Sequence, residues 1–128
     1  MKLFFPKMAN EESDEYIRRV AAELTPADEN DIIRRTIRKN RRSAAYAKGL
    51  TGRIGLLLDM LRDRNFKFTW SSRAIILAGL AYFVVPTDAL PDIIPFVGFV
   101  DDAAVIGAVF RRLRNEIERY REFLMQFE

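Results

Sequence analysis

The stretch AIILAGLAYFVVPTDALPDIIPFVGFV, residues 74–100, decides the fold of this chain. Only Asp88 and Asp92 are charged within it, and its three prolines, Pro86, Pro91 and Pro95, interrupt it from the middle onward. The uninterrupted arm 74–85 would be about 18 Å long as a helix, whereas the hydrocarbon core of a bilayer is about 30 Å thick. The stretch therefore predicts an apolar helix, a Pro/Asp loop and a second helix, and not a single membrane-spanning helix.

Two environments explain such a hairpin: the core of the protein, or a membrane that the hairpin enters and leaves on one side. Lys67 and Arg73 precede the first arm, and Arg111, Arg112 and Arg114 follow the second. Basic residues at both ends of the hairpin are typical of a hairpin that enters a membrane from the cytoplasmic face. They equally suit a core hairpin whose charged ends reach water. Of the two, we favour membrane contact.

Outward from the hairpin, apolar spacing and end signals predict further helices over about 13–24, 25–48, 51–64, 71–85 and 99 to near the C-terminus. The fold prediction is an all-α bundle of about five helices centred on the hairpin. Residues 1–24 would form a loose tail and a short acidic helix capped by Ser13. Residues 25–128 would form a single helical domain.

The last predicted helix carries apolar residues in a heptad pattern, which is typical either of a stripe facing the protein's own core or of a homo-oligomeric coiled coil. We favour the core stripe. The residues of this heptad seam are Ile106, Phe110, Leu113, Ile117, Tyr120, Leu124 and Phe127.

The composition excludes several chemistries. The chain has no cysteine and no histidine, which removes disulfides, thiolate nucleophiles and Ser-His-Asp triads, and argues against zinc. We predict no catalytic residue, no metal ligand and no cofactor. The N-terminal apolar run Leu3–Phe5 is too short for a signal peptide. We therefore expect a cytoplasmic protein, or one on the cytoplasmic side of a membrane.

Charge is concentrated in one segment: residues 32–53 carry eight basic groups and no acidic group, although the whole chain has a net charge of only +3. Most of the basic groups lie on the predicted second helix. We predict that they bind anionic lipid headgroups; a solvated face or a nucleic-acid site would explain the same residues. The predicted anionic-surface residues are Arg34, Arg35, Arg38, Lys39, Arg41 and Arg42.

The loop and its flanks contain the string Y-x-x-x-P-x-D-x-x-P-D-x-x-P-x-x-G-x-x-D-D. Its members are Tyr82, Pro86, Asp88, Pro91, Asp92, Pro95, Gly98, Asp101 and Asp102. With these residues the segment from about 80 to 112 resembles the YkvA-like family of small bacterial proteins, a family of unknown function. The resemblance implies a helical, often membrane-associated protein and implies no reaction.

The aspartates of this string admit two interpretations. Short carboxylates can accept hydrogen bonds from backbone N–H groups in turns and at helix starts, and Asp101 and Asp102 would fall in the first turn of the last helix. Alternatively, the four aspartates converge on a cation or on Arg73, Arg111 and Arg112. We favour the structural interpretation.

Taken together, these patterns predict a non-enzymatic, membrane-associated helical protein with an adaptor or structural role. The alternatives are a cation-binding or cation-dependent protein that uses the aspartates, and a nucleic-acid-binding module that uses the basic helix. The expected partner is anionic lipid, no protein partner follows from the sequence, and self-association through the heptad seam stays open.

Overall fold

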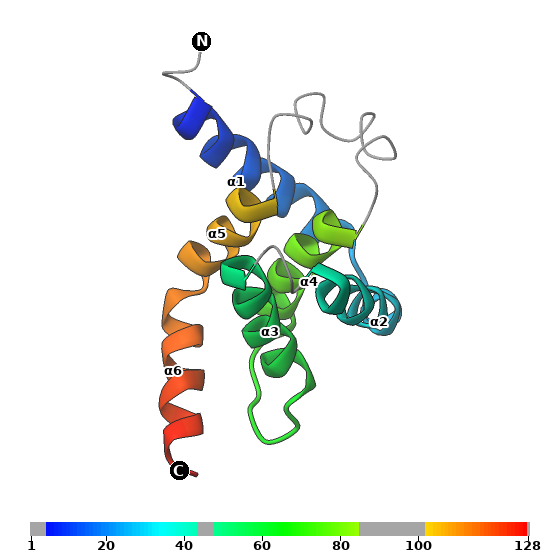
Figure 1. Ribbon diagram of the computed structural model, residues 1–128. Helices are drawn as coiled ribbons and strands as arrows, with labels where there is room; N and C mark the ends of the chain where they lie inside the picture. The colour runs from blue at the N-terminus through cyan, green and yellow to red at the C-terminus, as the bar shows by residue number, and fades with distance from the viewer. Residues whose placement is uncertain (1–4, 44–47, 85–101, 128) are drawn as a thin grey trace.

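The computed structural model describes residues 5–43, 48–84 and 102–127, and the chain folds into an all-α bundle (Figure 1). This confirms the predicted fold class. The described ranges contain six helices and no strand, because the last predicted helix is divided in two. The helices are α1 (Phe5–Glu23), α2 (Pro26–Ser43), α3 (Lys48–Arg62), α4 (Trp70–Val84), α5 (Asp102–Arg112) and α6 (Arg114–Met125).

Helix α4 is the centre of the bundle, with α1, α2, α3 and α5 packed against it. It is apolar on all sides, and a helix of that kind is expected to be buried all round. It begins after Thr69, whose Oγ1 accepts a hydrogen bond from the backbone N–H of Ser72 at 3.2 Å, and it ends two residues before Pro86, as proline requires. Its buried residues are Ser72, Ala74, Ile76, Leu77, Ala78, Gly79, Leu80, Ala81, Tyr82 and Phe83.

This burial answers the question that the first arm of the hairpin left open. The arm packs among the protein's own helices, so the core interpretation is correct for 74–84, and our preference for membrane contact is wrong there. The second arm lies largely outside the described residues. Within 5–43, 48–84 and 102–127, no helix combines the length and the apolar character that a membrane crossing requires.

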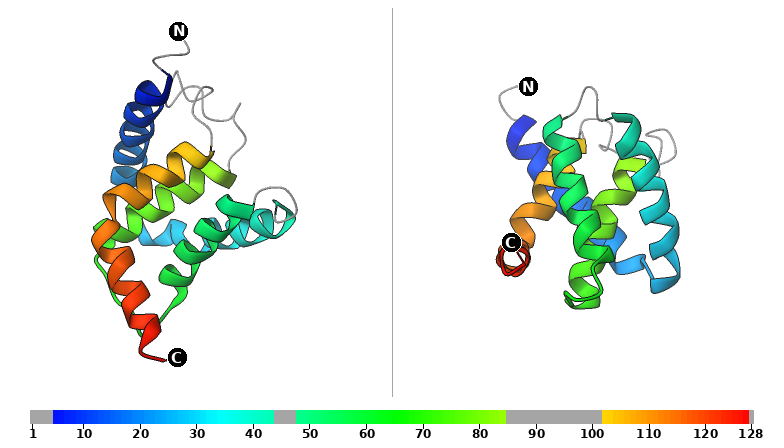
Figure 2. Two further views of the ribbon diagram at one scale, coloured as in Figure 1. Left: turned by 60° about the vertical axis from the view of Figure 1, so that its left-hand side comes forward. Right: turned by 60° about the horizontal axis from the view of Figure 1, so that its bottom comes forward.

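Helices α4 and α5 lie side by side at unusually close range (Figure 2). A Cβ atom placed on Gly79 would lie only 2.6 Å from Cγ2 of Val109 and 3.6 Å from Cδ1 of Ile106. Gly79 is therefore the residue that lets the two helices approach each other.

Helix α1 differs from its prediction. It begins at Phe5, so residues 5–12 are helical and Ser13 does not cap a helix start. Ser13 is instead fully buried inside the helix, one turn before the buried pair Tyr16 and Ile17. The packing of that face against α4 and α5 outweighs the local cap signal, because a helix that is already formed extends at little cost.

Helix α2 begins where predicted. Oδ2 of Asp28 accepts hydrogen bonds from the backbone N–H of Thr25 at 2.9 Å and from its hydroxyl at 3.2 Å. Helix α2 is described as far as Ser43, and the predicted stop Gly49 is instead the second residue of α3. The predicted apolar face of α3 is buried, with Ile54, Leu57, Leu58 and Leu61 all in the core.

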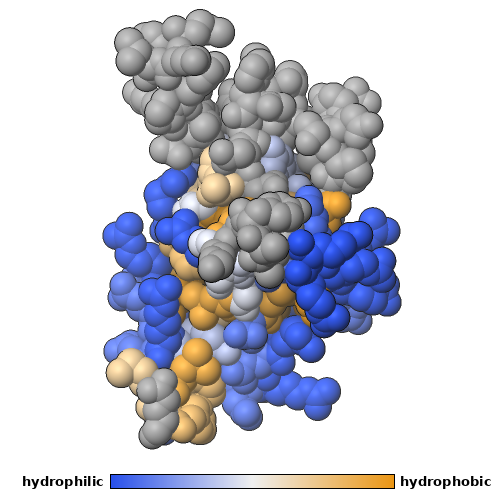
Figure 3. All heavy atoms as spheres, viewed as in Figure 1, coloured by the Kyte–Doolittle hydropathy of each residue, from blue (hydrophilic) through white to orange (hydrophobic). Residues whose placement is uncertain are grey.

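The heptad seam is part of the core over most of its length: Ile106, Leu113, Ile117 and Tyr120 are at most 3% exposed, and Phe110 is half-buried. The predicted continuous helix is interrupted at Leu113, where φ of −112° and ψ of 28° turn the chain. Beyond Tyr120 the protein's own helices no longer cover the seam. Figure 3 shows an apolar group at the foot of α6, where Leu124, Met125 and Phe127 are exposed.

Candidate functional site

The basic residues of α2 gather on the surface beside the carboxyl end of α4. Among them, Lys39 is half-buried and the other five predicted residues are exposed. Figure 3 shows hydrophilic side chains covering this side of the molecule. The structure therefore places all six predicted anionic-surface residues on one helix, most of them within reach of solvent.

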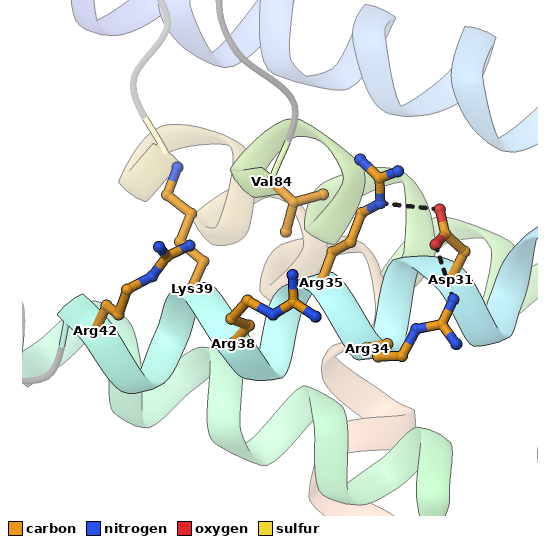
Figure 4. A pocket seen from close by; sticks show the side chains of 7 residues that line it. All are labelled: Asp31, Arg34, Arg35, Arg38, Lys39, Arg42 and Val84. Atoms are coloured by element: carbon orange, nitrogen blue, oxygen red, sulfur yellow. Dashed lines mark hydrogen bonds and ion pairs between the residues drawn. The ribbon is translucent and has the colours of Figure 1, made fainter.

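Part of this face is an open depression of about 670 Å³ between α2 and the end of α4 (Figure 4). Val84 supplies the apolar wall, and among the described residues Asp31 is the only acidic one that lines the depression. Five cationic side chains surround it against this single carboxylate, so the depression attracts anions. The cationic residues are Arg34, Arg35, Arg38, Lys39 and Arg42.

Asp31 neutralises one end of the depression. Its carboxylate accepts a hydrogen bond from Arg34 at 3.1 Å and pairs with Nε of Arg35 at 3.0 Å. The hydrogen bond from Arg34 is the largest influence on the pKa of Asp31 and lowers it; desolvation opposes this, and Arg35 lowers the pKa further. Asp31 thus stays ionised, and its two arginines are partly occupied.

At the other end of the depression, the arginines are not paired with acidic residues of the described part of the chain. Arg38, Arg41 and Arg42 have no ion-pair partner among the residues that the structure describes. Arg41 lies just outside the depression, in a second shallow hollow floored by Ile37. An incoming anion would therefore meet unpaired guanidinium groups here.

Lys39 links the basic helix to the core helix. Its ammonium group donates a hydrogen bond to the backbone carbonyl of Phe83 and lies 4.7 Å from the centroid of the Phe83 ring. The last carbonyl groups of a helix lack intrahelical donors and carry partial negative charge, so a cation there is stabilising. Lys39 consequently fixes the position of Val84, the next residue, at the depression.

Of the nine predicted motif residues, the structure describes one side chain. Tyr82 is buried, and its ring meets that of Tyr16 edge to face at a centroid distance of 5.2 Å. Asp102 is the first residue of α5, and its side chain is not among those described. The other seven, Pro86, Asp88, Pro91, Asp92, Pro95, Gly98 and Asp101, lie outside the described residues, as does any convergence of the four aspartates.

The arginines considered as partners for those aspartates are engaged elsewhere. Arg73 pairs with Glu29 and donates a hydrogen bond to the carbonyl of Leu61 at 3.0 Å. Arg111 and Arg112 lie 3.9 Å and 3.7 Å from Oδ1 of Asp14. Across the described ranges, no group of three or more acidic residues is close enough to hold a metal ion.

Two members of the depression were not predicted. Asp31 precedes Arg34 and Arg35 by three and four residues, a spacing that predicts helix-surface ion pairs, so the sequence did contain this signal. Val84 belongs to another helix and carries no local signal of its role. Its place at the depression depends on how α2 packs against α4.

Comparison with known proteins bears on this site. Residues 72–108 match the family described as "Protein of unknown function (DUF1232)". The uncharacterized membrane protein YkvA of Bacillus subtilis (strain 168) is 34% identical over 93 residues, which cover 70% of this chain and 82% of the relative. The chain belongs to the YkvA-like family. No solved structure matches it.

The segment that matches the family model includes most of α4 and more than half of α5. Residues 72–108 run from the first turn of the core helix α4 into the middle of α5. The basic depression lies at the point where α4 ends within that segment, since Val84 belongs to both. The cations around it come from α2, which the family match does not include.

Proposed function

We propose that this YkvA-like protein associates with membranes through the basic face of α2, which docks on anionic lipid headgroups. One observation carries the proposal: in the part of the chain that the structure describes, five cationic side chains and one acidic residue surround an open depression. The relative from Bacillus subtilis is described as a membrane protein, which supports a membrane setting.

The expected strength of docking follows from the charges. Each lysine or arginine close to an anionic surface contributes roughly 1 kcal/mol of attraction. The exposed face contributes through Arg38, Arg41 and Arg42, which have no competing ion pair among the described residues. Because the Debye length is about 8 Å at physiological ionic strength, the attraction should weaken as salt is added.

The rest of the proposed role follows from the sequence. With no cysteine and no histidine, the chain lacks the commonest nucleophiles and proton-transfer groups, which supports an adaptor or structural role without a reaction of its own. The same proposal puts the protein on the cytoplasmic side of the membrane, since that leaflet carries the anionic lipids.

The test compares two double variants that change the net charge equally. Arg38→Gln with Arg42→Gln removes two cations of the depression, whereas Arg18→Gln with Arg19→Gln removes two cations of α1 that pair with Glu15. Cosedimentation would be measured with vesicles of phosphatidylglycerol and phosphatidylcholine, and with phosphatidylcholine alone.

We expect the α2 variant to bind the anionic vesicles roughly 30-fold less well, which corresponds to about 2 kcal/mol for two cations. The α1 variant should bind nearly as well as the wild type. Equal losses in both variants would reduce the effect to net charge, and no binding by the wild type at low salt would refute the proposal. Retention on RNA or DNA that responds to the α2 variant, without vesicle binding, would favour the nucleic-acid alternative.

A further inference from the structure

A second basic surface lies away from α2, in an open groove of about 410 Å³ between α3, α5 and α6. Four arginines line it together with a single acidic residue, Glu118. Helices α2 and α6 stand on opposite sides of the bundle in Figure 1 and in the right-hand view of Figure 2. The groove is therefore separate from the face that we assign to the membrane. Its arginines are Arg53 of α3, Arg111 of α5, and Arg114 and Arg121 of α6.

Two of these arginines converge over a glycine. A Cβ atom placed on Gly107 would lie 3.9 Å from Nη1 of Arg53 and 3.9 Å from Nη1 of Arg111. The two guanidinium groups thus approach the same point from different helices. Two cations that approach one point repel each other, and an anion bound between them would relieve that repulsion.

Three of the four arginines in the groove have no ion-pair partner among the described residues, and the fourth, Arg111, has one long contact. The guanidinium of Arg53 lies over the ring of Phe110, 5.1 Å from its centroid, a geometry that orients it. Arg111 has one ion-pair contact, through Nη2, with Asp14 at 3.9 Å. Among the described residues, Arg53, Arg114 and Arg121 have no ion-pair partner.

The chemistry of the groove favours phosphate. A single arginine can satisfy a carboxylate with two parallel N–H donors, whereas a phosphate group has more oxygens and more charge and suits two guanidinium groups. The buried side chain of Ile117 and the half-buried ring of Phe110 supply an apolar wall beside the arginines. Such a wall suits the organic part of a small phosphorylated molecule.

We propose that this groove binds a phosphate group through Arg53 and Arg111, with Arg114 and Arg121 adding charge at its rim. The phosphate belongs either to a soluble phosphorylated molecule or to a lipid headgroup. This site is independent of the membrane-docking face, and either proposal can fail without the other.

The test uses the full chain and inorganic pyrophosphate as the probe, with binding measured by calorimetry at constant ionic strength. The variant is Arg53→Gln with Arg111→Gln, and its matched control is Arg18→Gln with Arg19→Gln on α1, outside both proposed binding surfaces. All four side chains are exposed, so both variants should fold. A parallel arm measures cosedimentation with vesicles that contain phosphatidic acid.

Saturable binding of pyrophosphate that falls at least tenfold in the groove variant, and is kept in the α1 variant, would establish a site for soluble phosphates. Failure of pyrophosphate to bind, together with loss of phosphatidic acid binding in the groove variant alone, would assign the site to a headgroup. No binding in either arm, or equal losses in the two variants, would overturn the proposal.

Gly107 provides a second, independent variant. Gly107→Glu would place a carboxylate between Arg53 and Arg111, where it would occupy the proposed site from within. Gly107→Ala is its control, because the added methyl group would be in ordinary van der Waals contact with both guanidinium groups. We expect the probe that binds the wild type to be lost with glutamate and kept with alanine. Undiminished binding by a folded Gly107→Glu protein would overturn the proposal.

Discussion

Helices α2 and α4 pack against each other, yet most of α4 is buried and most of α2 is exposed to solvent. Ten of the fifteen residues of α4 are buried, and they face four other helices. Among the described side chains of α2, Ile32 and Thr36 are the buried ones, and the helix presents arginines to solvent along most of its length. The comparison separates two roles that the sequence left mixed: the apolar helix supports the fold, and the charged helix is exposed on the face that we propose for membrane docking.

The largest expected effect tests the supporting role of α4. Leu80 is fully buried, and replacing it by alanine should lower the free energy of unfolding by about 2–5 kcal/mol, because a large side chain leaves a cavity. Arg38→Ala on the exposed face of α2 should change it by less than about 0.5 kcal/mol. Urea unfolding would measure both. Similar values for the two variants would contradict the division between the helices.

A smaller effect is expected where α4 meets α5. Gly79→Ala places a methyl group against Val109, and overpacking costs about 1–3 kcal/mol, while the better helix propensity of alanine returns about 1 kcal/mol. A net loss of about 1 kcal/mol should appear in thermal or urea unfolding. Adding Val109→Ala should leave the double variant more stable than the sum of the single changes predicts. Strictly additive changes would show that the methyl group at position 79 does not clash with Val109.

The contact that Lys39 makes between α2 and α4 should contribute less to the free energy of unfolding. Lys39→Met keeps the aliphatic stem but removes the ammonium group that reaches the Phe83 carbonyl. We expect a loss of roughly 0.5–1 kcal/mol in unfolding free energy, the usual range for one hydrogen bond. Arg41→Met, an exposed position with the same change in charge, is the control and should be nearly neutral. A larger loss of unfolding free energy in Arg41→Met than in Lys39→Met would contradict a stabilising role for the Lys39 hydrogen bond.

The smallest effect concerns the ionisation of Asp31 at the exposed end of α2. Because Arg34 and Arg35 lower the pKa of Asp31 in the folded state, any stability that it contributes is present above its unfolded pKa. That stability is lost as the pH falls through the folded value. Arg34→Gln should raise the pKa of Asp31, measured by NMR titration of its side chain, and Arg41→Gln should not. An unchanged pKa in the first variant would contradict the ion pair.

The fold was predictable where short-range rules decide it. The Thr25–Asp28 cap and the spacing of Ile54, Leu57 and Leu61 use neighbours within one or two turns, and both are as predicted. The start of α1 at Phe5 was not, because Ser13 has an excellent local cap pattern but lies in a face that tertiary packing buries. The interruption at Leu113 was missed because a heptad repeat predicts the buried face and not a change of axis.

The candidate site was predictable only in part, for the same reason. Six basic residues on one helix are visible as a run in the sequence. The pairing of Arg73 with Glu29 joins residues 44 positions apart. The convergence of Arg53 and Arg111 over Gly107 depends on the packing of α3 against α5. Contacts of this kind follow from the fold, and no local pattern indicates them.

The close approach at Gly79 also constrains how related sequences can diverge. A side chain at this position is accommodated only if the one at position 109 becomes smaller, since Val109 already occupies the space. Across relatives that keep this packing, residue volumes at the two positions should therefore vary inversely. Lineages that have lost the glycine should carry alanine, serine or glycine opposite it, which makes the pair a sequence marker of the α4–α5 contact.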